Sequence, residues 1–364
     1  MQENRVPLTP SSVEFLVNNG HRIVIESKAG SSANFTDREY SEAGAEIAQN
    51  CAQVYEADII LKVDPPTLGE VEMIKPNKLL ISALQLTNLD ELLLRKLKAK
   101  RINALAYELL QDESGSLPII RAMSEIAGHA AVLIAAEYLT NSRVGKGELL
   151  GGFAGIPPTQ IVIIGAGSVG EYAARAALGL GANVKVFDNN PYRLRRLQNS
   201  LGTRLFTSIL QPEALFKALS NADVAIGAIR APHGRTPCVV SEPMVAAMKE
   251  GSVLVDVSID QGGCFETSEV TNHSYPTFTK HGVIHYCVPN IASRVPKTAT
   301  RALSNIFAPI LNSVGEEAGL ENLLKKNRGV RQGVYMYQGI LTNEFLGETY
   351  GIPYKDLDLL MSAL

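Results

Sequence analysis

The stretch Gln160–Asp188, QIVIIGAGSVGEYAARAALGLGANVKVFD, most constrains the fold of this chain. Ile161–Ile164 is an unbroken apolar run rich in β-branched side chains, which is typical of a parallel strand buried on both faces. Three glycines, Gly165, Gly167 and Gly170, follow at once. In a dinucleotide-binding turn the first glycine makes the tight turn, the second lets the backbone approach a pyrophosphate, and the third lets the helix pack on the strand. The stretch therefore predicts a strand, a glycine turn, a helix and a second strand.

The residues around this turn indicate which dinucleotide binds. A helix that opens at Ser168 directs its N–H groups and the positive end of its dipole at the phosphates. Asp188 ends the second strand, about 20 residues after the turn, where a carboxylate accepts hydrogen bonds from the adenosine ribose. Its charge opposes a 2′-phosphate, so NAD(H) is favoured over NADP(H) as the cofactor. Arg193, Arg195 and Arg196 keep NADP(H) as the alternative, because arginines near that acid can receive a phosphate; otherwise they form a solvated basic helix face.

Composition excludes several classes of protein. With 364 residues, of which 46% are hydrophobic, the chain can bury a large core and is long enough for about two domains. A net charge of −3 gives no overall attraction to nucleic acid or to acidic membranes. The apolar run Ala130–Ala136 is far shorter than the roughly 20 residues that span a bilayer, so we expect no membrane segment. The 4 cysteines show neither CxxC spacing nor the density of a disulfide scaffold, which predicts a cytoplasmic protein without a metal site.

The first part of the chain alternates between strand and helix patterns. A helix is expected over Pro10–Asn19, since Thr9 and Pro10 suit its N-cap and first position and Gly20 suits its end. Four strands with helices between them are expected at Arg22–Glu26, Asp58–Val63, Leu79–Leu84 and Ile102–Tyr107. This alternation predicts a parallel sheet with helices on both faces. Because such a domain usually begins with a strand, we expect one upstream of Arg5 that is absent here, leaving a gap in the sheet.

The rest of the chain predicts a second domain inserted into the first. Arg121–Leu139 is an alanine-rich helix candidate, and Gly151–Pro158 is a loop that leads into the glycine turn. Further strands are expected near residues 204–207, 224–228, 253–257 and 283–287, which gives six with the first two. From Pro296 the pattern changes to helix, long over Lys297–Val314 and shorter beyond. The predicted fold is α/β with two Rossmann-like doubly wound domains: an NAD-binding domain over 119–296 inserted within a discontinuous substrate domain of 1–118 and 297–364, with a cleft between them.

Three polar residues are candidates for chemistry in such a cleft. Lys62 ends the apolar strand DIILKV, and Asp260 follows the strand VLVDVS within SIDQGGCFE. Arg5 precedes the first helix. An arginine offers a fork for a carboxylate, a lysine can polarise a carbonyl, and an aspartate can move a proton. Each could instead form an ordinary surface ion pair; position at a strand end favours chemistry for Lys62 and Asp260 and decides nothing for Arg5.

Six motifs together resemble one known family. They are RVPLTP from Arg5, LKVDPP around Lys62, MSEIAG from Met123, GAGSVG, VDVSIDQGGCFE, and YCVPNIASRVPKTAT from Tyr286. Over nearly its whole length the chain resembles alanine dehydrogenase and its relative, the NAD-binding α-subunit of proton-translocating transhydrogenase. The resemblance implies reversible oxidative deamination of L-alanine to pyruvate and ammonia, with NAD as the cofactor and a homo-hexamer as the assembly.

The resemblance also implies roles for residues at the matching positions. Arg5 and Lys62 would hold the substrate carboxylate and carbonyl, and Met123 and Asn290 would line the substrate and nicotinamide pocket. Asp260 would be the catalytic acid or base. The dinucleotide would be held by Ser124, Gly165, Gly167, Ser168, Val169, Gly170, Asp188 and Arg193, together with Asp260, Asn290 and Ile291.

Two positions depart from the family pattern. Gln85 stands where alanine dehydrogenases are expected to have a histidine that serves as acid/base beside the lysine, and an amide does not titrate near neutral pH. Asp64 replaces the usual glutamate two positions after Lys62. Either Asp260 alone handles the proton, or the substrate differs from alanine. Two alternatives stay open: a related dehydrogenase that joins an amine to a 2-oxo acid, and a non-catalytic NAD(H)-binding module that partners a membrane transhydrogenase subunit.

Overall fold

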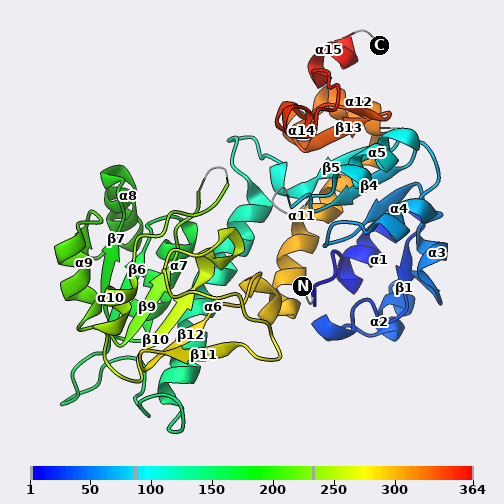
Figure 1. The fold of residues 1–364 in the computed structure, drawn as a ribbon. Helices are drawn as coiled ribbons and strands as arrows, with labels where there is room; N and C mark the ends of the chain where they lie inside the picture. Colours follow the sequence, from blue (N-terminus) through cyan, green and yellow to red (C-terminus); the bar gives the residue numbers. More distant parts are fainter. Residues whose placement is uncertain (1–2, 86–88, 232–233, 318, 363–364) are drawn as a thin grey trace. The chain divides into compact units, whose positions relative to one another are not determined.

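The computed structural model describes residues 3–85, 89–231, 234–317 and 319–362, which form two compact units (Figure 1). Unit 1 comprises Met123–Arg294. Unit 2 comprises Glu3–Ala122 and Val295–Leu364. The chain leaves unit 2 along the helix α6 (Pro118–Thr140) and returns to it at the start of α11 (Pro296–Glu316).

Unit 1 is built on a seven-stranded sheet with the order β11-β12-β10-β9-β6-β7-β8. Its strands are β6 (Gln160–Ile164), β7 (Asn183–Phe187), β8 (Phe206–Ser208), β9 (Val224–Gly227), β10 (Val253–Asp256), β11 (Thr277–Lys280) and β12 (Val283–Tyr286). All pair in parallel except β11, which pairs antiparallel with β12 at the edge. Without β11, the strands run 3-2-1-4-5-6 in chain order across the sheet, which is the order of a dinucleotide-binding fold.

The predicted Rossmann topology is therefore confirmed, but the predicted count of six strands was wrong. The seventh strand, β11, has the sequence TFTK and is only half-buried on the edge of the sheet. Its polar, short pattern does not distinguish it from a loop. It becomes a strand because a short turn folds it back on β12, where Phe278 stacks against the buried ring of His285.

Helices cover both faces of the sheet in unit 1. Ile161 and Ile163 of β6 pack in the cluster formed with α6, α7 (Ser168–Gly179) and α8 (Pro191–Leu201). Val162 and Ile164, which point to the opposite face, pack in the cluster that includes α9 (Pro212–Leu219) and α10 (Glu242–Ala246). Alternate residues of one strand thus enter two different cores, which explains why the strand is apolar throughout.

Unit 2 contains a five-stranded sheet with the order β14-β13-β5-β4-β3. Its parallel strands are β3 (Ile59–Leu61), β4 (Leu79–Ser82) and β5 (Asn103–Ala106). The strands β13 (Val334–Tyr337) and β14 (Ile340–Leu341) extend it antiparallel. The prediction that the chain is helical after Pro296 was therefore wrong at 334–341. The pairing of β13 with β5 joins segments that are far apart in the sequence, so local patterning does not reveal it.

The N-terminal part of unit 2 forms a second, two-stranded parallel sheet of β1 (Val24–Glu26) and β2 (Glu46–Ala48). Within the residues described, no strand pairing joins these two strands to the five-stranded sheet. The strand expected upstream of Arg5 stays a prediction.

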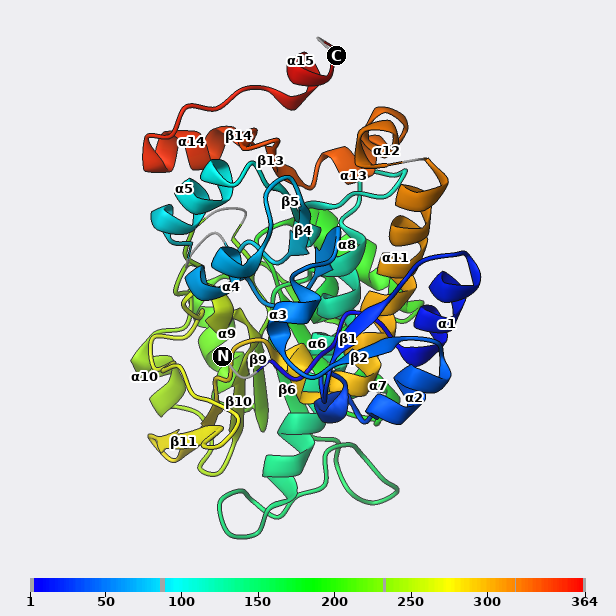
Figure 2. The same cartoon turned by 90° about the vertical axis from the view of Figure 1, so that its right-hand side faces the viewer.

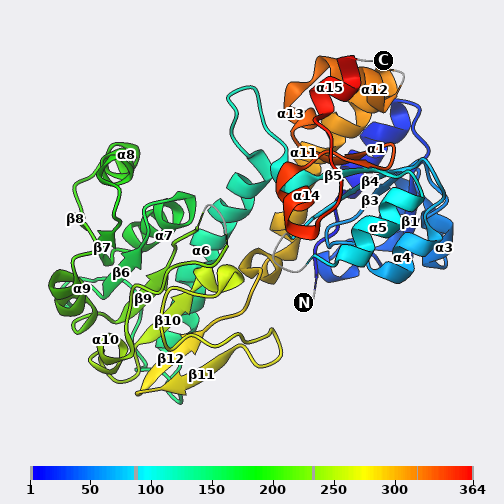
Figure 3. The same cartoon turned by 45° about the horizontal axis from the view of Figure 1, so that its top comes forward.

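The helices of unit 2 begin where the sequence supplies capping side chains. Thr9 accepts a hydrogen bond from the N–H of Ser12 at the start of α1, and Thr36 and Thr67 form capping boxes with Glu39 and Glu70. Residues of α4 (Leu68–Met73), α5 (Glu91–Ala99) and α14 (Glu344–Tyr350) pack in one core with β3, β4 and β5. Figure 3 shows the ribbons of these elements within unit 2. The helices are α1 (Pro10–Asn18), α2 (Asp37–Glu42), α3 (Cys51–Val54), α4 (Leu68–Met73), α5 (Glu91–Ala99), α12 (Leu320–Lys326), α13 (Arg328–Arg331), α14 (Glu344–Tyr350) and α15 (Leu357–Ser362).

The helix α6 is long and apolar enough to cross a membrane by length and composition, and it is the one such helix among the residues described. Ala131, Ile134 and Leu139 of this helix lie in the core of unit 1, and core helices of globular domains pass the same test. Residues 141–159 follow α6 as an extended loop, drawn in blue-green in Figure 2.

Candidate active site

The glycine turn of unit 1 joins β6 to α7. Gly165 has φ +114°, a conformation that side chains disfavour, and its N–H donates to the carbonyl of Phe187 at 2.7 Å. A Cβ added at Gly170 would lie 1.9 Å from the carbonyl oxygen of Gly165. A Cβ added at Gly167 would meet no atom within 4 Å. The first and third glycines are therefore required by the fold, whereas the second leaves space beside the backbone.

The start of α7 suits an anion. Gly167 is the N-cap of this helix, and no side-chain hydrogen bond caps it within the part of the chain that the structure describes. The N–H groups of the first turn, from Ser168 onward, therefore have no acceptor in an N-cap side chain. Backbone N–H groups and the helix dipole at such an end favour a phosphate. The open space at Gly167 and this uncapped helix end together fit the pyrophosphate of a dinucleotide.

Asp188 directly follows β7 and holds the glycine turn in place. Its Oδ2 accepts a hydrogen bond from the N–H of Ala166 at 2.7 Å, and its Oδ1 accepts one from the N–H of Asn190 at 2.8 Å. The side chain is 9% exposed. Arg193 Nη1 lies 3.9 Å from Oδ2 and its side chain is half-exposed. The acid that the sequence predicts for the ribose thus has a structural role that sequence reasoning did not foresee, because it holds the turn through the N–H of Ala166.

Asp260 lies on the loop that follows β10. The short helix η4 (Val257–Gln261) carries it, and Gly262 and Gly263 follow with φ +94° and +78°. Asp260 is exposed, and its Oδ1 accepts a hydrogen bond from the N–H of Asn290 at 2.7 Å. Asn290 itself has φ +55° and precedes the short helix η5 (Ile291–Arg294). Folding therefore brings together two of the predicted residues, Asp260 and Asn290, from loops after β10 and β12.

Met123 and Ser124 lie near the start of α6, where both are half-buried. One turn later, Gly128 packs so tightly that an added Cβ would lie 2.4 Å from the carbonyl oxygen of Val169. Because Val169 belongs to the first turn of α7, this contact places the N-terminal half of α6 against the helix that follows the glycine turn. Ser124 and the glycine turn therefore lie on elements in direct contact.

In unit 2, Arg5 is paired with a carboxylate. Its Nε and Nη2 donate to the two carboxylate oxygens of Glu3 at 2.7 and 2.6 Å, and the Arg5 side chain is 9% exposed. Burial opposes the charged form, but the hydrogen bond from Arg5 to Glu3 and the charge of Glu3 outweigh it and raise the pKa of the Arg5 guanidinium. Arg5 thus stays a cation in a nearly buried position.

Lys62 directly follows β3 and is also paired. Its Nζ donates to both oxygens of Glu70 at 2.7 and 2.8 Å, with the two side chains 21% and 26% exposed. Burial alone would raise the pKa of Glu70, but hydrogen bonds from Lys62 and the N–H of Thr67 lower it. The sequence signal for this partner is the capping pair Thr67 and Glu70, which fixes the glutamate on the first turn of α4. Glu3 offered no comparable signal beyond lying two residues before Arg5.

Gln85 has φ +47°, and its N–H donates to Glu108 Oε1 at 3.1 Å. The N–H of Leu84 donates to the same oxygen at 2.7 Å. Glu108 therefore holds the bend after β4 that carries Gln85. Asp64 lies in the same unit and is half-buried, and burial followed by the charge of Glu3 raises the pKa of its carboxyl.

No group of three or more His, Cys, Asp or Glu side chains suited to a metal ion occurs among the described residues. The chemistry that these side chains can supply is hydrogen bonding, ion pairing and proton transfer.

Comparisons with known proteins agree over nearly the full chain. Residues 1–127 match the family described as alanine dehydrogenase/PNT, N-terminal domain, and residues 131–344 match its C-terminal domain. The chain is 40% identical over 357 residues to "Alanine dehydrogenase 2" of Staphylococcus aureus (strain USA300), covering 98% of this chain and 95% of the relative.

Solved structures give a consistent result. An "L-alanine dehydrogenase" structure superimposes with a TM-score of 0.89 at 36% sequence identity, covering 96% of both chains. The transhydrogenase of Sinorhizobium meliloti superimposes with a TM-score of 0.80 at 24% identity, covering 94% of this chain and 96% of the other, which is a likeness of fold.

Proposed function

This chain belongs to the alanine dehydrogenase/PNT family, and from that premise we propose which of its residues carry out the reaction and with which cofactor. The chain is an amino-acid dehydrogenase that interconverts L-alanine with pyruvate and ammonia by means of a nicotinamide cofactor. The observation that carries this function is the 40% identity to an alanine dehydrogenase over 98% of the chain. A nicotinamide cofactor, when bound, takes a hydride from the Cα of alanine.

The cofactor is NAD rather than NADP. Asp188 is a nearly buried carboxylate beside the glycine turn, where the adenosine ribose of a bound dinucleotide lies in this fold. A ribose hydroxyl can donate to its oxygens, whereas a 2′-phosphate would meet its negative charge. Arg193 supports the same preference, since its guanidinium lies within ion-pair distance of Asp188 and partly satisfies that carboxylate instead of a phosphate.

Two cations of unit 2 bind the substrate. The Nε and Nη2 groups of Arg5 donate to Glu3, and a guanidinium can hold carboxylates on more than one edge. Lys62 polarises the carbonyl of pyruvate, or the C=N bond of its imine, because a nearby ammonium stabilises the electron density that collects on that group. Glu70 holds the Lys62 ammonium in one position.

Asp260 moves the proton. In the direction of deamination it takes a proton from the water that attacks the imine carbon, and in the reverse direction it returns the proton to the departing oxygen. The hydrogen bond from the N–H of Asn290 holds one carboxylate oxygen of Asp260, and the ionised carboxylate is the form that acts as a base. Gln85, which replaces the expected histidine, orients a substrate oxygen or water by hydrogen bonding and transfers no proton.

The test is to follow NADH absorbance with L-alanine and NAD, and in parallel with NADP. We expect turnover with NAD and little with NADP. Asp260→Asn should lower kcat by a factor on the order of 100 or more, which is the usual contribution of a general acid or base. Full NADH production by Asp260→Asn would remove that residue from the mechanism.

The same assay separates the alternatives. Turnover that requires a second amine together with a 2-oxo acid would identify the related amine-joining reaction. Tight NADH binding without any turnover of alanine would identify a non-catalytic nucleotide module. We further propose a homo-oligomer, with the hexamer favoured by family membership, which light scattering of the purified protein measures directly.

A further inference from the structure

A second aspartate lies beneath the loop that carries Asp260. Asp256 is the last residue of β10 and is 1% exposed. Its Oδ1 accepts a hydrogen bond from the N–H of Ser258 at 3.0 Å. Its Oδ2 accepts one from the N–H of Cys264 at 3.0 Å and one from the hydroxyl of Ser268 at 2.7 Å. One carboxylate therefore binds three points of the same loop.

The carboxylate of Asp256 is packed closely against two glycines. A Cβ added at Gly227, the last residue of the neighbouring strand β9, would lie 2.7 Å from Oδ1. A Cβ added at Gly263, which has φ +78°, would lie 2.7 Å from Oδ2. Burial raises the pKa of the Asp256 carboxyl, against the hydrogen bonds from Ser268, Cys264 and Ser258 that lower it. The loop is thus folded closely around this side chain.

The same loop is attached to its neighbours on two sides. The hydroxyl of Ser258 accepts a hydrogen bond from the N–H of Ile229 at 3.0 Å, and Gln261 Oε1 accepts one from the N–H of Ala231 at 3.1 Å. Asp260 lies between these two residues and accepts the N–H of Asn290. The direction of the Asp260 carboxylate therefore depends on where residues 257–261 are held.

We propose that Asp256 is the positioning residue for Asp260: its buried carboxylate fixes the loop from Val257 to Ser268 and thereby sets the catalytic geometry. The inference rests on the proposed function, in which Asp260 transfers the proton. Asp256 acts through hydrogen bonds to the loop and touches neither substrate nor cofactor. A displacement of about 1 Å of a reacting group can lower a rate on the order of 100-fold, so loosening this loop has a kinetic effect.

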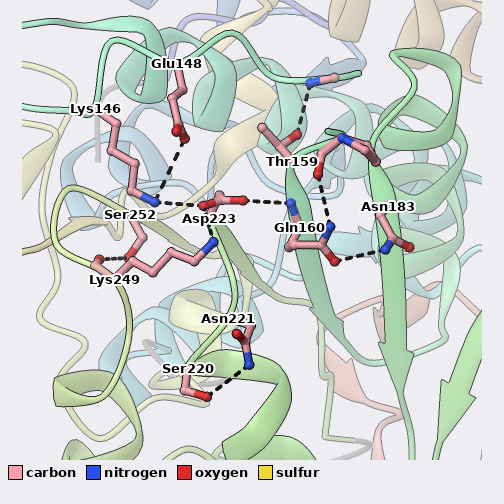
Figure 4. Close-up of polar contacts among 12 residues, drawn as sticks. Lys146, Glu148, Thr159, Gln160, Asn183, Ser220, Asn221, Asp223, Lys249 and Ser252 are labelled. Carbon is pink, nitrogen blue, oxygen red and sulfur yellow. Dashed lines mark hydrogen bonds and ion pairs between the residues drawn. The ribbon is translucent and has the colours of Figure 1, made fainter. Parts of the chain in front are cut away.

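Unit 1 offers a matched control in Asp223, which lies at the amino end of β9, whereas Asp256 lies at the carboxyl end of the neighbouring strand β10. Figure 4 shows the polar contacts of Asp223. Asp223 directly precedes β9 and is 6% exposed. Its Oδ2 accepts the N–H of Gln160 at 2.8 Å, and its Oδ1 accepts the ammonium groups of Lys146 and Lys249, each at 2.8 Å. It is a buried, backbone-anchoring aspartate like Asp256, but it holds no residue assigned to the reaction.

The experiment compares Asp256→Asn with Asp223→Asn in the full chain. In Asp256→Asn an NH₂ group replaces one carboxylate oxygen, so the backbone N–H that donated to that oxygen, of either Ser258 or Cys264, loses its acceptor. We expect kcat with L-alanine to fall on the order of 100-fold, while KM and the Kd for NADH stay within about twofold. The pH profile of kcat/KM should change as well, because the loop that presents Asp260 to Asn290 is then held less firmly. Asp223→Asn should lower Tm and change neither kcat nor the pH profile.

A milder variant covers the case in which Asp256→Asn does not fold. Ser268→Ala removes one donor to Asp256, and its kcat should fall in the same direction by a smaller factor. Ser252→Ala is its control, because the Ser252 hydroxyl donates to the Lys249 carbonyl at the amino end of β10, on the same side of the sheet as Asp223. Unchanged kcat and pH profile in folded Asp256→Asn, or in Ser268→Ala if only that variant folds, would overturn the proposal.

Amide hydrogen exchange gives a readout that does not depend on turnover. Peptides covering 257–268 should exchange faster in Asp256→Asn than in the wild type, whereas in Asp223→Asn they should not. If the wild type does not oxidise alanine, the proposed function is refuted. If exchange is nevertheless faster in Asp256→Asn, the role of Asp256 in fixing the loop is still supported. Unchanged exchange would refute that role whatever the substrate is.

Discussion

Replacing the glycines of the dinucleotide turn one at a time by alanine should separate folding from nucleotide binding. Gly167 has φ −78°, which alanine adopts readily, and a Cβ there meets nothing within 4 Å. Alanine is a poorer N-cap than glycine, but it also lowers the entropy of the unfolded chain, so the free energy of unfolding should change by less than about 1 kcal/mol. A bound pyrophosphate must approach this backbone, and an added methyl group excludes it.

We therefore expect Gly167→Ala to fold normally and to bind NADH on the order of 100-fold more weakly, which corresponds to about 2.7 kcal/mol. Gly170→Ala should behave differently, because its Cβ would lie 1.9 Å from the Gly165 carbonyl oxygen and the turn must widen. Overpacking of this kind lowers the free energy of unfolding by about 1–3 kcal/mol. Gly179→Ala, near the end of the same helix with no atom within 4 Å, is the control and should be stabilised by about 0.5–1 kcal/mol.

Urea unfolding and NADH fluorescence titration measure the two quantities on each variant. The reasoning fails if Gly167→Ala binds NADH like the wild type, since the glycine turn would then not hold the phosphates. It also fails if Gly170→Ala is as stable as Gly179→Ala, since the tight contact between α7 and β6 would then not constrain the turn.

Three further predictions concern buried or paired polar groups. Asp188→Asn should weaken NADH binding and also lower Tm, because the carboxylate accepts from the N–H groups of Ala166 and Asn190; a loss of affinity with Tm unchanged would contradict the structural role. In the folded chain the Nδ1–H of His285 donates to the Val283 carbonyl, and its Nε2 accepts from the Thr267 hydroxyl. Burial lowers the pKa of His285, so as the pH falls the unfolded chain takes up a proton at this residue before the folded chain does. The stability from neutral His285 is complete above the unfolded pKa of about 6.5 and is lost as pH falls toward the lower folded pKa, at no more than about 1.4 kcal/mol per pH unit. Tm measured from pH 7 to pH 5.5 should fall, less so in His285→Gln than in the exposed control His129→Gln, and equal slopes would refute this assignment. Glu70→Gln should raise the KM for alanine, because the Lys62 ammonium is then no longer held in one position by a carboxylate. An unchanged KM would show that Lys62 needs no such partner.

Local patterns in the sequence predicted most of the elements of unit 1. The apolar run before Gly165, the three glycines and the acid at Asp188 required a βαβ unit, because each position has a steric or electrostatic role that few residues fill. Helix starts were equally local, as at Thr9 and Pro10, since a cap depends on residues within one turn. The strands that were missed, β2, β11, β13 and β14, are short and gain their stability from a partner strand rather than from their own pattern.

Residue types for the site could also be read from the sequence, since Lys62, Asp188 and Asp260 stand at the ends of recognisable strands, whereas Arg5 was indicated only by the family resemblance. What the sequence determined was therefore the class of fold, the nucleotide turn and the kinds of charged group available. Tertiary structure alone decided how each charge is held: Glu3 pairs with Arg5, Glu70 with Lys62, and Asp256 anchors the loop beneath Asp260. The physical reason is that burial and hydrogen-bond partners depend on distances between segments, which a pattern along one chain does not contain.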